Sequence, residues 1–252
     1  MAEVRGLPFC EERPLPAGGL LVRLGGRARP ATITREALRD IRRALASWEG
    51  RRELRWLAFA SANPTTFLAG ADFRELEALS PAEALGFAAF GQETLSLMRQ
   101  SRLWLVAIVE GACMGGGLDF ALACDYRIAT PKARFAHPGT RLGFFTGWGG
   151  TSALPRLSGA GIPALLSGEV LAAKDALKLG WIEEVSSEPL SRTCRRARQS
   201  AAADLALIKQ AARASALPLS LRIPFCRRLA EHARAARETQ PPQRHKGLGG
   251  ET

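Results

Sequence analysis

Three consecutive glycines, Gly115–Gly117, and a lone carboxylate at Asp119 form the segment of this chain with the clearest capacity for chemistry. The glycines follow an apolar run of strand length and precede an apolar stretch of helical character. This order places free backbone N–H groups at a helix N-terminus, where an anion or a developing negative charge is stabilised. Three interpretations follow: a dinucleotide site, a close helix–strand contact with Asp119 as a surface acid, or an oxyanion hole. The glycines do not fit the spacing G-x-G-x-x-G, which argues against a dinucleotide.

A second glycine-bearing loop, "FLAGADF" at 67–73, favours the oxyanion hole. It also follows an apolar strand, and Ala71 offers its N–H directly after the flexible Gly70. Two N–H groups from separate loops can hold one carbonyl oxygen and stabilise the charge that grows on it by roughly 3–4 kcal/mol per donor.

The strands that must position these loops are indicated by apolar runs. The stretch 18–26 reads as a strand closed by glycines, and the apolar runs at 54–61 and 103–111 are typical of strands that are covered on both faces. Two shorter strands are predicted at 126–130 and 133–137. The alternation of these strands with helical segments predicts an α/β fold.

The helices are indicated by apolar spacing and by capping residues. A helix is predicted over 34–48 with Thr34 as its N-cap, and another begins at the capping box of Ser80. The stretch 63–72 has the composition of a loop. Shorter helices are predicted at 149–159, 162–168 and 173–180.

The pattern changes near the C-terminus. A strand is predicted at 181–185, and beyond about residue 190 the pattern is only helical, up to a loose tail at 239–252. We therefore expect an α/β core over 1–190 and a helical region with the tail over 191–252.

Four segments, in this order and spacing, resemble the crotonase, or enoyl-CoA hydratase/isomerase, superfamily. They are "AGADF" at 69–73, "GGGLDFALACDYRIA" at 115–129, "LGFFTGWGGTSALPRL" at 142–157 and "SGEVLAAKDALKLGWIEEV" at 167–185. The resemblance implies a spiral of ββα units with an acyl-CoA site, and C-terminal helices that help to build trimers or hexamers. Coenzyme A then enters as part of the thioester substrate, without a separately bound cofactor.

The resemblance also implies roles for individual residues. The N–H groups of Ala71 and Gly116 would hold the thioester oxygen. Arg74 stands where the family often carries a basic residue near the CoA phosphates, although a solvated loop arginine fits equally. Residues expected to line the substrate and CoA site are Ala69, Gly70, Asp72, Arg74, Gly115, Gly139, Gly147 and Trp148.

The chain departs from the family pattern at its two acidic positions. Typical hydratases carry two glutamates, and here the first position is Asp119 and the second is Gly139. Hydration needs one group that deprotonates water and another that delivers a proton, and glycine does neither. Asp119 is either the remaining acid/base or an acid that complements the helix dipole.

His137 is the second catalytic candidate. If the strand at 133–137 continues, residues 137 and 139 face the same side, so the imidazole reaches the space that the lost glutamate leaves. The alternative is an imidazole that is satisfied by a backbone carbonyl. Gly147 lies where its N–H would face the catalytic water of a hydratase, with Thr146 in place of the usual proline. Trp148 either lines the acyl pocket or belongs to the core.

Several functions remain open at this point. The first is an enoyl-CoA hydratase/isomerase-type enzyme with Asp119 as its acid/base, in which isomerisation suffers less than hydration. The second keeps the oxyanion hole for decarboxylation of a malonyl-type thioester or for thioester hydrolysis with His137 as base. The third is a non-catalytic binder of acyl-CoA, or of RNA through its arginines.

Composition limits these choices. The net charge is +11, from 35 Lys and Arg against 24 Asp and Glu, which fits a solvated basic face or binding of phosphate-bearing ligands. The single tyrosine gives little support to RNA readout by stacking. Five cysteines without a C-x-x-C pattern and three scattered histidines argue against a disulfide framework and a metal site. The chain lacks an apolar run of membrane-spanning length, and the acidic N-terminal segment is unlike a secretory signal, so we expect a cytoplasmic protein.

Overall fold

The structure, a computed structural model, describes residues 9–143, 146–199 and 205–214 and the single positions 223, 227 and 231. The chain divides into two compact units, residues 1–203 and 204–252. The boundary at 190 that the sequence suggests therefore falls within helix α8 (Pro189–Gln199) of the first unit. The described helix of the second unit is α9 (Leu205–Ala214).

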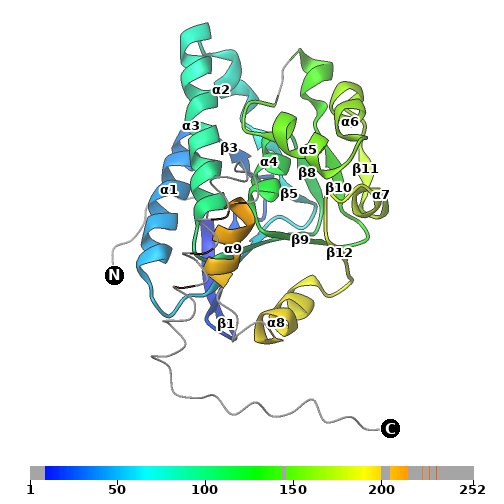
Figure 1. Ribbon diagram of the computed structural model, residues 1–252. Helices are drawn as coiled ribbons and strands as arrows, with labels where there is room; N and C mark the ends of the chain where they lie inside the picture. Colours follow the sequence, from blue (N-terminus) through cyan, green and yellow to red (C-terminus); the bar gives the residue numbers. More distant parts are fainter. Residues whose placement is uncertain are drawn as a thin grey trace, which may run out of the picture. The chain divides into compact units, whose positions relative to one another are not determined.

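The main sheet has six strands in the order β1-β2-β4-β7-β9-β12, of which Figure 1 labels β1, β9 and β12. These are β1 (Phe9–Leu15), β2 (Gly19–Leu24), β4 (Trp56–Ser61), β7 (Trp104–Val109), β9 (Tyr126–Ala129) and β12 (Glu184–Val185). Only β1 runs antiparallel to its neighbour. The two longest apolar runs form the central strands β4 and β7, whose residues are almost all buried, which confirms the expectation of strands covered on both faces.

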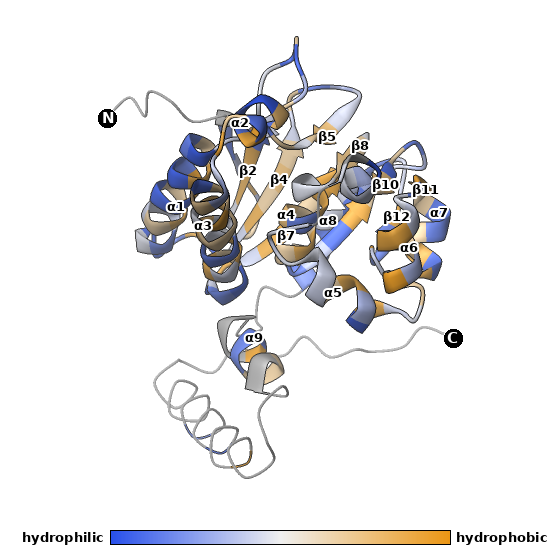
Figure 2. Ribbon diagram, turned by 90° about the horizontal axis from the view of Figure 1, so that it is seen from above, coloured by the Kyte–Doolittle hydropathy of each residue, from blue (hydrophilic) through white to orange (hydrophobic). Residues whose placement is uncertain are grey.

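Alternate side chains of β4 enter two different apolar clusters. Leu57 and Phe59 join the larger one, which lies among the strands and helices that build the site. Trp56 and Ala58 join a smaller cluster on the opposite face, against α8. Successive side chains of a β-strand point to opposite faces of the sheet, so the residues of β4 alternate between the two clusters. Figure 2 shows hydrophobic colour along these strands and hydrophilic colour on α1 (Arg35–Gly50).

Of the segments that form the two smaller sheets, only 133–137 was predicted as a strand. One has the order β11-β10-β8-β5, with β11 (Leu171–Ala172), β10 (Arg134–Ala136), β8 (Ala112–Met114) and β5 (Thr66–Leu68). The other pairs β3 (Thr32–Ile33) with β6 (Gly70–Ala71). The loop prediction over 63–72 is therefore wrong. The strands there are so short that pairing with distant segments, and not local propensity, defines them.

The remaining helices connect these strands. They are α2 (Phe73–Glu77), α3 (Pro81–Gln100), α4 (Gly116–Ala123), the 3₁₀ helix η1 (Pro138–Leu142), α5 (Gly150–Leu157), α6 (Gly161–Ser167) and α7 (Ala173–Lys178). The predicted caps are confirmed, since the Thr34 hydroxyl accepts the Ala37 N–H and the Ser80 box with Glu83 is complete. Helices α1 and α3 pack against each other (Figure 1). Over the described residues, each helix is too short or too polar to cross a lipid bilayer.

Candidate active site

A cavity of about 260 Å³ lies at the N-terminus of α4, between α2, α3 and the segment from β10 to α5. Most residues that the sequence suggested for the site line it: Ala69, Gly70, Ala71, Gly115, Gly116, Asp119, His137, Gly139, Gly147 and Trp148. Asp72 and Arg74 are outside this lining.

Two glycines bring the backbone of β6 against the start of α4. Gly70 and Gly115 have φ values of +105° and +51°, a region that side chains rarely adopt. A Cβ added to Gly70 would lie 3.2 Å from the Gly116 nitrogen, and one added to Gly116 would lie 3.3 Å from the Ala71 nitrogen. The two amides therefore come close together at one wall of the cavity.

Hydrogen bonds of the neighbouring residues hold these two segments in place. The N–H of Asp72, which follows Ala71, donates to the Ile33 carbonyl of β3 at 3.2 Å. The N–H of Gly115, which precedes Gly116, donates to the Ala136 carbonyl at 2.9 Å. Gly116 is the first residue of α4, and the first N–H groups of a helix have no acceptor within the helix. The Gly116 N–H is thus open to an acceptor outside the helix.

Asp72 caps helix α2 and does not line the cavity. Its carboxylate accepts the N–H groups of Arg74 and Glu75 at 3.1 and 3.3 Å, and so forms the N-cap of α2. The Thr32 hydroxyl donates to it at 2.9 Å, and this bond, followed by the bond from Glu75, lowers the pKa of Asp72. The cap fixes the short helix that carries apolar side chains into the cavity.

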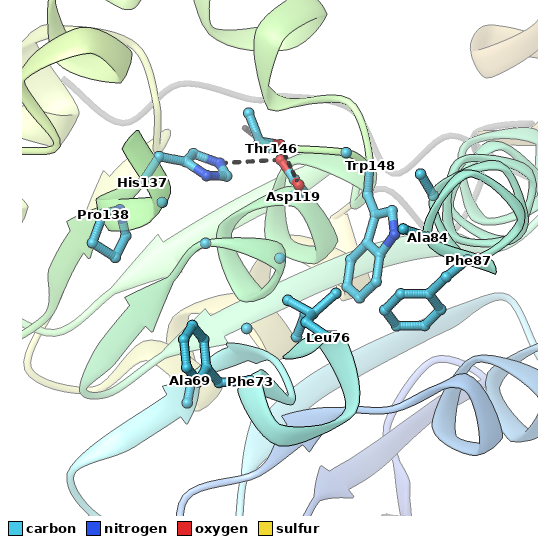
Figure 3. Close-up of a pocket in the computed structure, with 17 residues that line it drawn as sticks. Ala69, Phe73, Leu76, Ala84, Phe87, Asp119, His137, Pro138, Thr146 and Trp148 are labelled. Carbon is cyan, nitrogen blue, oxygen red and sulfur yellow. Dashed lines mark hydrogen bonds and ion pairs between the residues drawn. The ribbon is translucent and has the colours of Figure 1, made fainter. Parts of the chain in front are cut away.

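Asp119 lies beneath the cavity and is nearly fully buried, with 2% exposure. The alternative of a surface acid is therefore wrong. The Thr146 hydroxyl donates to its Oδ2 at 2.6 Å, and His137 Nε2 lies 3.1 Å from its Oδ1 (Figure 3). The second contact has ion-pair distance but not hydrogen-bond alignment. Catalytic hydrogen bonds are often poorly aligned until substrate binds.

Gly150 and Arg99 complete the surroundings of this carboxylate. A Cβ on Gly150 would lie 2.5 Å from Asp119 Oδ1 and 2.6 Å from His137 Nε2, so only glycine fits against the pair. Arg99 lies on α3 beside Gly149. Burial lowers the pKa of the Arg99 guanidinium, and the charge of Asp119 acts in the opposite direction.

His137 reaches the cavity by a different route from the predicted one. Strand β10 ends at Ala136, and Pro138 begins η1, so the condition that the strand continues to residue 139 is not met. Proline favours the first helical position because its φ is already helical and its missing N–H has no acceptor there. The imidazole nevertheless lines the cavity, and its Nε2 faces the Asp119 carboxylate and not a backbone carbonyl.

The family of the chain can now be decided. The family model for enoyl-CoA hydratase/isomerase matches residues 17–239. The chain belongs to this family. Two solved structures at comparable identity are an enoyl-CoA hydratase from Geobacillus kaustophilus HTA426 (26% identity, TM-score 0.81, covering 90% of this chain and 93% of that one) and DspI from Pseudomonas aeruginosa (28%, 0.78, 91% and 96%). An enoyl-CoA hydratase from Bacillus anthracis shares the fold at 21% identity, with a TM-score of 0.82 over 92% of this chain and 97% of that one. The predicted family and α/β fold are confirmed.

The cavity of this member of the enoyl-CoA hydratase/isomerase family has few polar side chains in its lining. Gly139, which the sequence resemblance suggests as the position of a second glutamate, lines the cavity without a side chain. The polar groups present are instead Asp119, His137 and Thr146. Over the described residues, groups of three or more His, Cys, Asp or Glu with the geometry of a metal site are not found.

The sequence did not predict most of the apolar side chains that line this enoyl-CoA hydratase/isomerase site, nor the hydroxyl of Thr146. Thr146 had a signal, because it replaces the usual proline with a side chain that can donate. The apolar residues had none, since spacing along a helix does not separate pocket from core. The missed lining residues are Phe73, Leu76, Ala84, Phe87, Ala88, Pro138 and Thr146.

Proposed function

We propose that this chain is an enzyme for acyl-CoA thioesters, with the N–H groups of Ala71 and Gly116 as its oxyanion hole and Asp119 as acid and base. The observation that carries the proposal is the approach of these two amides at one cavity wall. When a proton leaves C2 of the substrate, negative charge moves onto the thioester oxygen. Two preorganised donors stabilise that charge by roughly 3–4 kcal/mol each.

Asp119 is well placed to move the proton. It follows Gly116 by three residues in α4, so the two are neighbours on one helix face, about 5–6 Å apart. Its Oδ2 accepts the Thr146 hydroxyl and its Oδ1 faces His137, and the carboxylate lines the cavity in which the substrate would bind. His137, 3.1 Å from Oδ1, stabilises the ionised carboxylate when its Nε2 carries a proton.

The residues favour isomerisation over hydration. Hydration needs a second group that orients and deprotonates water, and Gly139 supplies none. Isomerisation needs only one carboxylate, which removes a proton from C2 of a 3-enoyl thioester and returns it to C4 of the dienolate. The product is the 2-enoyl thioester, and the enzyme recovers its starting state without a metal or redox cofactor.

The experiment is a turnover panel of 2-enoyl, 3-enoyl and 3-hydroxyacyl thioesters with wild type and Asp119→Asn. We expect turnover of the 3-enoyl thioester, and a loss in kcat of about 10²- to 10⁴-fold in Asp119→Asn, because an amide cannot accept the proton. Double-bond migration is followed by the ultraviolet absorbance of the 2-enoyl product.

Asp40 of α1 supplies the matched control. It is also a helical aspartate with 2% exposure, but it lies outside the cavity lining. We expect Asp40→Asn to leave kcat within a few-fold of wild type. Equal kcat in Asp119→Asn and Asp40→Asn would refute the role of Asp119, and an inert panel would refute the isomerase.

The facing pair of His137 and Asp119 also favours a second function, hydrolysis of the thioester. A carboxylate beside one imidazole nitrogen orients the ring and leaves the other nitrogen as a base. With Nε2 turned to Asp119, Nδ1 takes the proton from a water that attacks the thioester carbon. The C–S bond then breaks, and the imidazolium returns the proton to the CoA thiolate.

Release of free CoA thiol distinguishes the two functions. If the chain is a hydrolase, CoA accumulates with wild type, and His137→Ala abolishes the release while added imidazole restores part of it. If it is an isomerase, the thioester stays intact and only the double bond moves. CoA release that persists unchanged in His137→Ala would exclude the histidine as the base.

A further inference from the structure

The cavity has a polar end and an apolar end. Asp119, His137 and Thr146 gather at the polar end (Figure 3). The apolar end is lined by side chains of α2 and α3 and by one indole: Leu76, Ala84, Phe87, Ala88 and Trp148. A molecule that fills the cavity therefore presents its reacting group to one end and a hydrocarbon group to the other.

Trp148 is wedged between α3 and α4 at the apolar end. A Cβ on Gly91 of α3 would lie 2.1 Å from its Nε1, and one on Gly116 of α4 would lie 2.5 Å from its Cζ3. The indole thus spans the gap between the two helices and fits only because both positions lack a side chain. Its exposure is 4%, although it lines the cavity.

Further contacts prevent this indole from moving aside. Phe87 packs edge-on against it, with ring centroids 5.3 Å apart and an interplanar angle of 84° (Figure 3). The Gln92 side chain donates to the carbonyl of the preceding residue, Gly147, at 2.7 Å. On the same segment Thr146 is bound to Asp119 at 2.6 Å. Because the ring and the segment before it are closely packed and hydrogen-bonded, the indole forms a rigid wall of the cavity.

We infer that the Trp148 indole closes the acyl end of the cavity and restricts this chain to thioesters of short acyl groups. The inference rests on the proposed function, because the amides of Ala71 and Gly116 fix where the acyl chain starts. An acyl chain that extends from a carbonyl at Gly116 begins beside the indole, because the Gly116 backbone packs against the Trp148 ring. The cavity of about 260 Å³ must also hold the thioester group itself.

The test is binding, so that it does not depend on turnover. Saturated acyl-CoAs from acetyl through butanoyl, hexanoyl and octanoyl to dodecanoyl are titrated by calorimetry into wild type, Trp148→Ala and Trp148→Phe. We expect wild-type affinity to rise only over the shortest chains and then to fall. Trp148→Ala moves the optimum to longer chains, with about a fourfold gain for each methylene that becomes buried.

Trp104 provides a matched control. It lies on β7 against Trp56 and Tyr126, outside the cavity lining, so Trp104→Phe leaves the chain-length profile unchanged. Trp148→Phe, a milder change that keeps an aromatic ring, shows an intermediate shift even if Trp148→Ala does not fold. An unchanged profile in both Trp148 variants, or equal wild-type affinity for butanoyl and dodecanoyl thioesters, overturns the inference alone. Failure of every thioester to bind overturns the proposed function and this inference with it.

Discussion

At the scale of single residues, the hydrogen atom that Gly150 carries in place of a side chain keeps the Asp119–His137 pair together. A Cβ at this position would lie 2.5 Å from the carboxylate, 2.6 Å from the imidazole and 3.0 Å from the Thr146 hydroxyl. All three groups meet at one point above α4. A methyl group there must displace at least one of them.

We therefore predict that Gly150→Ala lowers kcat by about a hundredfold, because a displacement of about 1 Å in a reacting group has an effect of this size. The measurement is steady-state turnover of the thioester that wild type uses best, together with thermal unfolding. Gly86→Ala is the control, since Gly86 is helical and a Cβ there meets open space. It keeps kcat and stabilises α3 by about 0.5–1 kcal/mol. A Gly150→Ala enzyme as fast as wild type would show that the chemistry does not need this pair.

At the scale of elements, the sequence predicts what local patterns encode. Runs such as "LWLVAIVEG" become buried strands because their side chains are apolar on both faces of the sheet. The helix that follows Ser80 begins where its capping box predicts. By contrast, β5 and β6 have three and two residues, and they exist only because β8 and β3 lie beside them. No local pattern encodes such a partner.

The candidate site also has features that local sequence predicts and features that depend on contacts between distant segments. The glycines and Asp119 were predictable because turn and helix-start chemistry is local. The distance from His137 to Asp119 was not, since it depends on where β10 ends and how η1 turns the ring. The wedged position of Trp148 depends on the packing of α3 against α4, which makes Gly91 a site residue in effect although its sequence context is an ordinary helix.

At the scale of the whole molecule, one carboxylate joins three elements of the first unit. Glu184 of β12 accepts the Tyr126 hydroxyl of β9 at 2.7 Å and two arginines of α8, Arg192 at 2.6 Å and Arg196 at 3.1 Å. Helix α8 covers the face of the main sheet opposite the site. Burial alone would raise the pKa of Glu184, but these hydrogen bonds outweigh it and lower the pKa to about 2.

This lowered pKa predicts how the stability of the molecule depends on pH. A carboxylate with a lower pKa in the folded state contributes stability above its unfolded value of 4.5 and loses it as the pH falls toward 2. The arginines are about half exposed, so solvent screening reduces the effect to about 1 kcal/mol. Between pH 7 and pH 3, wild type should thus lose about 1 kcal/mol more of its free energy of unfolding than Glu184→Gln, measured by denaturant titration. Glu188→Gln, a change at an exposed residue near the start of α8, should retain the wild-type loss. If Glu184→Gln and wild type lose equal amounts, the network does not couple α8 to the sheet, and the acid sensitivity of the fold arises elsewhere.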